Sequence, residues 1–169
     1  MKIKFTILCS ALLVFIESGL RAQNFGATLN CVTNPPDFSK LTYEEANKAT
    51  YSETRRKTCP EYTANLVNQI RYGKLSNDNK VLAIFLLGEL RPSDTNSLEV
   101  FIEDIDFKAS RFDEPAAFPR WGLYPAEEAL MYKVGKPAVN PILNHLPSET
   151  NELRRQLMCD VLKQVLRDK

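Results

Sequence analysis

Four cysteines and one histidine are the side chains of this 169-residue sequence whose chemistry is most versatile. Their spacing matches no zinc site. The sequence also lacks a Gly-x-Ser-x-Gly nucleophile motif, a phosphate-binding loop and a dinucleotide fingerprint. His145 stands near the end of a predicted helix with no evident partner for metal or acid–base chemistry, so we interpret it as a contact with the helix dipole. We therefore expect no cofactor, no metal and no catalytic residue that the sequence identifies.

Acidic side chains gather at two places, and neither predicts a catalytic pair. Glu127 and Glu128 are neighbours on a predicted helix and point about 100° apart, so they cannot face each other across a substrate. The second group could bind Ca²⁺, but it lacks the Asp-x-Asp-x-Asp-Gly loop of such sites, and we interpret it as a solvated helix face. Its members are Glu99, Glu103, Asp104 and Asp106.

The segment 107–121 combines aromatic and arginine side chains without a helical period. Long connections without secondary structure are uncommon and are often functional. Aromatic and arginine side chains are also enriched among the residues that dominate binding energy. The sequence therefore predicts a partner-binding loop, while a lid folded over the hydrophobic core remains the alternative. The predicted partner-binding residues are Arg111, Phe112, Phe118, Arg120 and Trp121.

The first 22 residues have the pattern of a secretory signal peptide. Met-Lys-Ile-Lys is followed by the apolar run Phe5–Ile16, and cleavage after Ala22 fits the small residues that follow. An uncleaved membrane anchor is the alternative, but the apolar run is short for a bilayer. We expect a secreted or periplasmic protein with no membrane span after cleavage. No Asn-x-Ser/Thr sequon occurs.

The balance of basic and acidic side chains argues against partners that are bound through a strong electrostatic field. The mature chain would carry 19 basic and 20 acidic side chains, a net charge of −1. Neither nucleic acid nor an anionic membrane is predicted by such a balance.

Export would leave three cysteines in an oxidising compartment, where a disulfide can form. Three pairings are possible among Cys31, Cys59 and Cys159. We favour Cys31–Cys59, which would tie the N-terminal arm to the body and could stabilise the fold by about 3 kcal/mol. Cys159 lies beside the apolar face of a predicted helix and is interpreted as a partly buried small side chain.

The rest of the sequence predicts helices separated by short caps, after an irregular arm at 23–40. Thr42 with Glu45, and Thr58 with Glu61, have the spacing of capping boxes. The run Val81–Leu87 is apolar nearly all round, which predicts a buried central helix rather than a buried strand because polar caps flank it. The expected helices are 42–56, 61–72, 77–90, 96–105 and 148–169.

Residues 122–146 predict a tight hairpin of two short helices. Pro125 and Pro137 stand where each helix would begin, a position that needs no N–H group. Gly135 stands where the chain must reverse. Such a hairpin cannot bury both of its apolar faces alone, so it requires similar neighbours.

This hairpin resembles the short HEAT repeats of bacteria, a family of helical-hairpin repeats. An earlier and looser copy, Val81–Ile105, aligns Leu87-Gly88 with Val134-Gly135. The resemblance implies an all-α fold: a right-handed α-solenoid fragment of about three hairpins, covering residues 41–169. The matching positions in the hairpin are Ala126, Ala129, Leu130, Val134, Gly135, Pro137, Ala138, Val139, Pro141, Ile142, Leu143 and Leu146.

Such repeats mostly present surfaces to other proteins and imply no chemistry. The sequence thus favours an exported module that binds or scaffolds an unidentified protein. The alternatives are a small exported hydrolase or lyase with a site assembled from scattered carboxylates, and a structural module of the cell envelope.

Export can be tested directly on the secreted or periplasmic protein. Amino-terminal sequencing should read from Gln23 if the signal peptide is removed after Ala22. An intact Met1 on the exported protein would contradict cleavage and favour the anchor.

Overall fold

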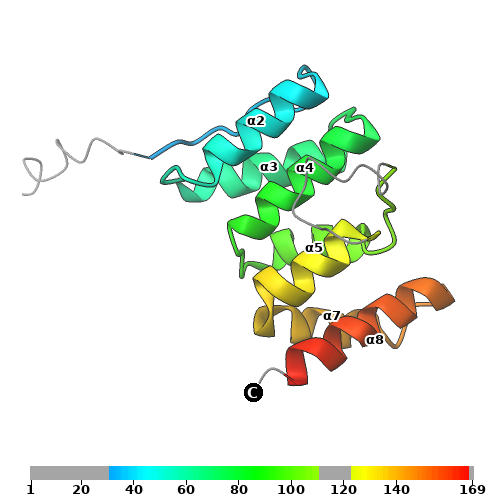
Figure 1. Cartoon of the computed structure of the whole chain (residues 1–169). Helices are drawn as coiled ribbons and strands as arrows, with labels where there is room; N and C mark the ends of the chain where they lie inside the picture. The colour runs from blue at the N-terminus through cyan, green and yellow to red at the C-terminus, as the bar shows by residue number, and fades with distance from the viewer. Residues whose placement is uncertain (1–30, 111–122, 168–169) are drawn as a thin grey trace, which may run out of the picture. The chain divides into compact units, whose positions relative to one another are not determined.

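The computed structural model of the chain describes residues 31–110 and 123–167. These residues form seven α-helices and two short helical turns and contain no strand, which confirms the all-α expectation. Figure 1 shows the helices following one another in chain order, from α2 at the top to α8 at the bottom. The α-helices are α2 (Tyr43–Glu53), α3 (Pro60–Tyr72), α4 (Asn77–Glu89), α5 (Thr95–Glu103), α6 (Pro125–Ala129), α7 (Val139–His145) and α8 (Glu152–Arg167).

Side-chain caps begin three of the first four helices. The capping box at the start of α2 is confirmed: Glu45 N donates to Thr42 Oγ1, and Thr42 N donates to Glu45 Oε2. Ser76 caps α4 and Asp94 caps α5 in the same way, each by accepting from a first-turn N–H group. These polar residues satisfy donors that have no partner within the helix, so they fix where each helix begins.

The second predicted capping box, at Thr58 and Glu61, is wrong. The N-cap of α3 is Cys59, and its side chain makes no capping hydrogen bond. Thr58 instead forms an isolated parallel bridge with Val32. The sulfur of Cys59 is engaged in a disulfide, so the helix begins at the bridged cysteine and at Pro60, which fits the first position.

Helix α4 occupies the centre of the hydrophobic core. Each residue from Val81 to Gly88 is buried, as expected for a helix that is apolar all round. It contacts α2 and α3 on one side and α6 with its following turn on the other. The central-strand alternative is thereby excluded.

Contacts join alternate helices along the chain. Helix α2 contacts α4, α4 contacts α6, and α6 contacts α8. In the second series α3 contacts α5, and α5 contacts α7. The helices thus form two rows, which cross-contact through α3 with α4, α5 with α6, and α7 with α8.

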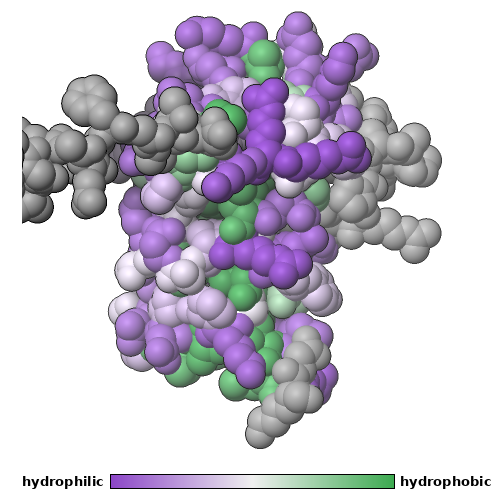
Figure 2. Space-filling view, turned by 90° about the vertical axis from the view of Figure 1, so that its left-hand side faces the viewer, coloured by the Kyte–Doolittle hydropathy of each residue, from purple (hydrophilic) through white to green (hydrophobic). Residues whose placement is uncertain are grey.

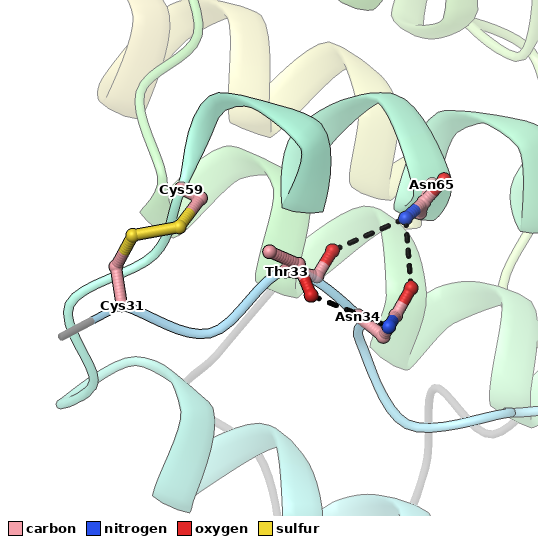
Figure 3. Close-up of a disulfide and its surroundings, with 5 residues drawn as sticks. All are labelled: Cys31, Thr33, Asn34, Cys59 and Asn65. Carbon is pink, nitrogen blue, oxygen red and sulfur yellow. Dashed lines mark hydrogen bonds between the residues drawn. A yellow bond between two sulfur atoms is a disulfide. The ribbon is translucent and has the colours of Figure 1, made fainter. Parts of the chain in front are cut away.

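The N-terminal arm is tied to α3 by the predicted disulfide between Cys31 and Cys59, which is present. Figure 3 shows the arm running beside α3, with Asn65 of the helix reaching back to it. Asn65 Nδ2 donates to Thr33 O at 3.1 Å and to Asn34 Oδ1 at 2.9 Å. Two backbone hydrogen bonds also hold the arm: Val32 N donates to Lys57 O, and Cys59 N donates to Val32 O. The arm is therefore held covalently at Cys31 and by hydrogen bonds at the three residues that follow it.

A polar triad with two buried members, Tyr62 and Glu53, and one exposed member, Arg56, fastens α2 to α3. Tyr62 is fully buried and donates its hydroxyl hydrogen to Glu53 Oε2 at 2.8 Å, while Arg56 lies 2.9 Å from the other carboxylate oxygen. Burial and the carboxylate raise the pKa of the Tyr62 hydroxyl, so it stays a donor at any physiological pH. The buried carboxylate thus has both a donor and a counter-charge, as burial of an ion requires.

The hairpin at 122–146 is confirmed in its turn residues but is less regular than expected. Helix α6 continues as a π-helical turn, η1 (Leu130–Val134), and a 3₁₀ turn, η2 (Lys136–Ala138), leads into α7. Gly135 joins the two at φ 68° and ψ −130°, and its N–H bonds Leu130 O five residues back. A residue with a Cβ is strained in that conformation.

Helix α8 begins later than the expected residue 148. Ser148 N and Oγ both bond His145 O, so this residue closes the end of α7. Helix α8 begins at Glu152, and its first-turn Arg154 N–H donates a hydrogen bond to Asn151 Oδ1. Within residues 31–110 and 123–167, no helix is both long enough and apolar enough to cross a membrane.

The turn at Gly135 generates a stability prediction. Gly135→Ala should lower the free energy of unfolding by about 2 kcal/mol, because alanine is strained at this φ and ψ although nothing lies within 4 Å of the added Cβ. Urea unfolding followed by circular dichroism measures the change. Lys136→Ala, at the exposed next residue, serves as the control. Equal stability of the two variants would contradict the backbone argument.

Candidate functional site

The five predicted partner-binding residues, Arg111, Phe112, Phe118, Arg120 and Trp121, lie outside the described residues. The structure does describe the two segments that flank them. These segments, 107–110 and 123–124, are called the loop base below. Ala109 N donates to Leu123 O at 3.0 Å, so the loop base is closed by a backbone hydrogen bond.

The loop base is fixed to the start of α4. Ser110 donates both its N–H and its hydroxyl to Asn77 Oδ1, at 2.9 and 2.7 Å. Asn77 Nδ2 in turn donates to Lys108 O. Phe107 packs against the core, and the Lys80 ammonium lies 4.7 Å from its ring centroid, within cation–π range. The loop base is therefore held in a defined position against α4.

The acidic group of α5 is only in part the solvated face that the sequence suggested: the Glu103 side chain is 52% exposed, whereas the other three are partly buried. Its four carboxylates are each paired with a different helix: Glu103 with Arg71 of α3, Asp104 with Lys80 of α4, Asp106 with Arg154 of α8, and Glu99 with His145 of α7. The nitrogen–oxygen distances run from 2.6 to 2.8 Å. Cations brought from other helices thus offset the repulsion among these acids.

Arg154 makes the largest set of these contacts. Its guanidinium donates to Glu149 Oε2 at 2.7 Å, to Asp106 Oδ1 at 2.8 Å, and to the carbonyl oxygens of Ile102 and Glu103 at 2.9 Å. The last two belong to the final two residues of α5, at the end of the helix where carbonyl groups lack their regular helical donors. Arg154 therefore caps α5 and joins it to α8.

His145 has a partner that the sequence did not reveal. Its Nε2 lies 2.6 Å from Glu99 Oε2 across the contact between α7 and α5. The expectation of a simple dipole contact is therefore incomplete. The sequence could not reveal this partner, because Glu99 lies 46 residues before His145 in the chain. The pair forms a contact between α7 and α5.

Glu127 is the carboxyl with the strongest electrostatic signature of a working site. Burial raises its pKa to about 7, and the negative charges of Asp160 on α8 and of Glu128 add to the shift. A carboxyl that titrates near neutrality can transfer protons under physiological conditions. The sequence identified Glu127 and Glu128 but missed Asp160, which only the packing of α6 on α8 brings near.

Large apolar side chains are exposed on the C-terminal part of the fold. Tyr132 of η1 is 63% exposed and Leu166 of α8 is 56% exposed, and Leu143 of α7 and Leu153 of α8 are also exposed. Figure 2 shows hydrophobic colouring toward the lower end of the molecule, where α7 and α8 lie in Figure 1. We call these four side chains the C-terminal apolar set. The sequence does not reveal the exposure of these four side chains, because it does not show which helix lacks a neighbour.

The remaining side chains of chemical interest are the potential metal ligands and the cysteine outside the disulfide. No group of three or more potential metal-binding side chains occurs there. Cys159 is a free, half-buried cysteine on α8, as its place beside the apolar face predicted.

The raised pKa of Glu127 predicts a pH-dependent stability. The folded state holds the proton up to about pH 7, whereas the unfolded chain releases it near the ordinary value of 4.5, so stability falls as pH rises through that window. Glu127→Gln mimics the protonated form and should reduce this loss by about 1 kcal/mol after allowance for solvent screening. Thermal unfolding at pH 5 and pH 8 measures it, with exposed Glu44→Gln as the control. An unchanged pH dependence in Glu127→Gln would refute the assignment.

No protein-family model, curated protein or solved structure gives a significant match to this chain.

Proposed function

We propose that this chain is an exported helical-repeat module that binds another protein. The observation that carries the proposal is the C-terminal apolar set: large apolar side chains are exposed on η1, α7 and α8, namely Tyr132, Leu143, Leu153 and Leu166. Exposed apolar surface is a common feature of protein-binding sites. Charged side chains of α5, by contrast, are engaged within the molecule.

The order of helix contacts supports the repeat interpretation. Two rows of alternate helices, α2-α4-α6-α8 and α3-α5-α7, are what stacked helical hairpins produce. No further described helix stacks on α7 and α8, and Leu143, Leu153 and Leu166 on these helices are exposed. The HEAT-like, right-handed solenoid and the helical-repeat range 41–169 are parts of this proposal.

The proposal includes a cellular compartment outside the cytoplasm. The disulfide between Cys31 and Cys59 suits an oxidising environment, and the first 22 residues have the pattern of a signal peptide. A secreted or periplasmic site of action follows from both. The aromatic segment 107–121 supplies a second candidate surface, because its described base is fixed to α4.

A second candidate function rests on Glu127. Its pKa of about 7 and the nearby charge of Asp160 suit a general acid or base, which favours a hydrolase or lyase as the alternative. Such an enzyme would turn over members of an ester, peptide or glycoside panel and lose that turnover in Glu127→Gln. Binding without turnover favours the first proposal.

Partner capture with matched variants tests the proposed binding. Immobilised residues 23–169 should retain a defined protein from the exported fraction of the source cells. Leu143→Ser/Leu166→Ser should reduce retention at least about tenfold, because loss of an apolar anchor costs more than 1.4 kcal/mol. The variant Phe112→Ala/Phe118→Ala/Trp121→Ala tests the aromatic segment in parallel and should also reduce retention if this segment binds the partner.

Tyr72→Ala is the control for this experiment, since Tyr72 is 78% exposed on α3. Circular dichroism confirms that each variant is folded. If both multiple variants retain the partner as well as Tyr72→Ala does, the proposed surfaces are wrong.

A further inference from the structure

We propose that the Cys31–Cys59 disulfide is an exchangeable latch, which an external dithiol opens by attacking Cys31 and displacing Cys59. The disulfide closes the arm onto α3, as Figure 3 shows, and the sulfurs of its two cysteines lie in different surroundings. This inference is independent of the protein-binding proposal.

The two cysteines differ in access. Cys31 is half-buried on the arm, whereas Cys59 is 2% exposed at the start of α3. Thiol–disulfide exchange needs a thiolate to reach one sulfur in line with the bond that breaks. An incoming thiolate therefore reaches Cys31, and Cys59 becomes the leaving group.

The start of α3 favours negative charge on the leaving sulfur. Cys59 is the N-cap, and its side chain makes no capping hydrogen bond in the oxidised state. A thiolate at this position gains the first-turn N–H groups of the helix and its dipole. Exposed Arg55 and Lys57 add positive charge nearby in the chain, and Glu61 in the first turn opposes it.

Opening the latch releases little besides the arm. Without the disulfide, the arm before Pro35 is held by the Val32 backbone bonds and by Asn65, and each such bond contributes about 1 kcal/mol. Phe38 is fully buried and its carbonyl accepts from Asn79 Nδ2 at 2.8 Å, so the chain remains anchored there. Reduction therefore loosens residues 31–34 and leaves the helical body folded.

The exchange balances with a dithiol as the reductant. Its first thiolate bonds Cys31 Sγ, the Cys31–Cys59 bond breaks, and Cys59 leaves as a thiolate. The second thiol of the reductant then attacks the mixed disulfide, which releases Cys31 and leaves the reductant as a disulfide. Two electrons pass from the dithiol to the protein, and protons from the thiols or from water neutralise the released thiolates.

Mixed-disulfide mapping on the exported full chain tests the latch. The chain carries Cys159→Ser to exclude exchange with the free thiol. After brief treatment with glutathione and trapping with N-ethylmaleimide, peptide mass spectrometry should find at least tenfold more glutathione on Cys31 than on Cys59. Complete reduction should leave the far-ultraviolet circular dichroism of the helices unchanged.

Hydrogen exchange supplies the second readout. Reduction should raise exchange at residues 31–34 at least threefold while α4 and α5 stay protected. Asn65→Ala should raise arm exchange further in the reduced chain, and Asn68→Ala, exposed on the same helix, should not. Glutathione distributed equally or found mainly on Cys59, resistance to reduction until urea unfolds the chain, or loss of helix on reduction would each overturn the proposal.

Discussion

The rest of the structure depends on the need to cover α4 on every side. A helix whose residues from Val81 to Gly88 are all buried has no face to offer to water. Each buried leucine, isoleucine or phenylalanine contributes about 1.5–3 kcal/mol only when neighbours exclude solvent from it. Helices α2, α3 and α6, together with η1, provide that cover from segments far apart in the chain. The stacking of alternate helices follows from this requirement.

The ion pairs of α5 decide how the remaining helices meet. Carboxylates near a helix C-terminus are unfavourable for the dipole, and partly exposed ion pairs contribute little each. Here a cation or imidazole from α3, α4, α7 and α8 meets one carboxylate each, so the set specifies the position of four helices relative to α5. Arg154 adds the capping of two α5 carbonyl groups. These contacts favour one arrangement over others that would leave a charge unpaired.

The two ends of the described fold are finished in different ways. At the N-terminal end, a disulfide and Asn65 close the arm onto α3. At the C-terminal end, α7 and α8 retain exposed leucines that no following helix covers in the described residues. A partner that covers the C-terminal apolar set would do for α8 what the neighbouring helices do for α4, since burial of apolar surface drives both folding and association.

The sequence by itself determined the helical class, most helix boundaries and the reversal at Gly135. These features depend on local chemistry: an oxygen that caps N–H groups at Thr42 and Ser76, a ring that suits the first turn at Pro125, and a missing Cβ where φ is positive. The apolar run of α4 also revealed the core, and export chemistry favoured the correct disulfide. The cap at Thr58 failed because the bridge with Val32 engages that residue from outside the local sequence.

Only the tertiary structure decided which charges are paired and which apolar side chains are exposed. His145 and Glu99 are 46 residues apart in the chain, and Asp160 acts on Glu127 across the contact of α8 with α6. Leu153 and Leu166 of α8 are exposed although Leu157, Val161 and Val165 of the same helix are buried. A pattern along one helix reports its apolar side but not whether a neighbour covers it, because burial and pairing depend on segments that meet only when the chain folds.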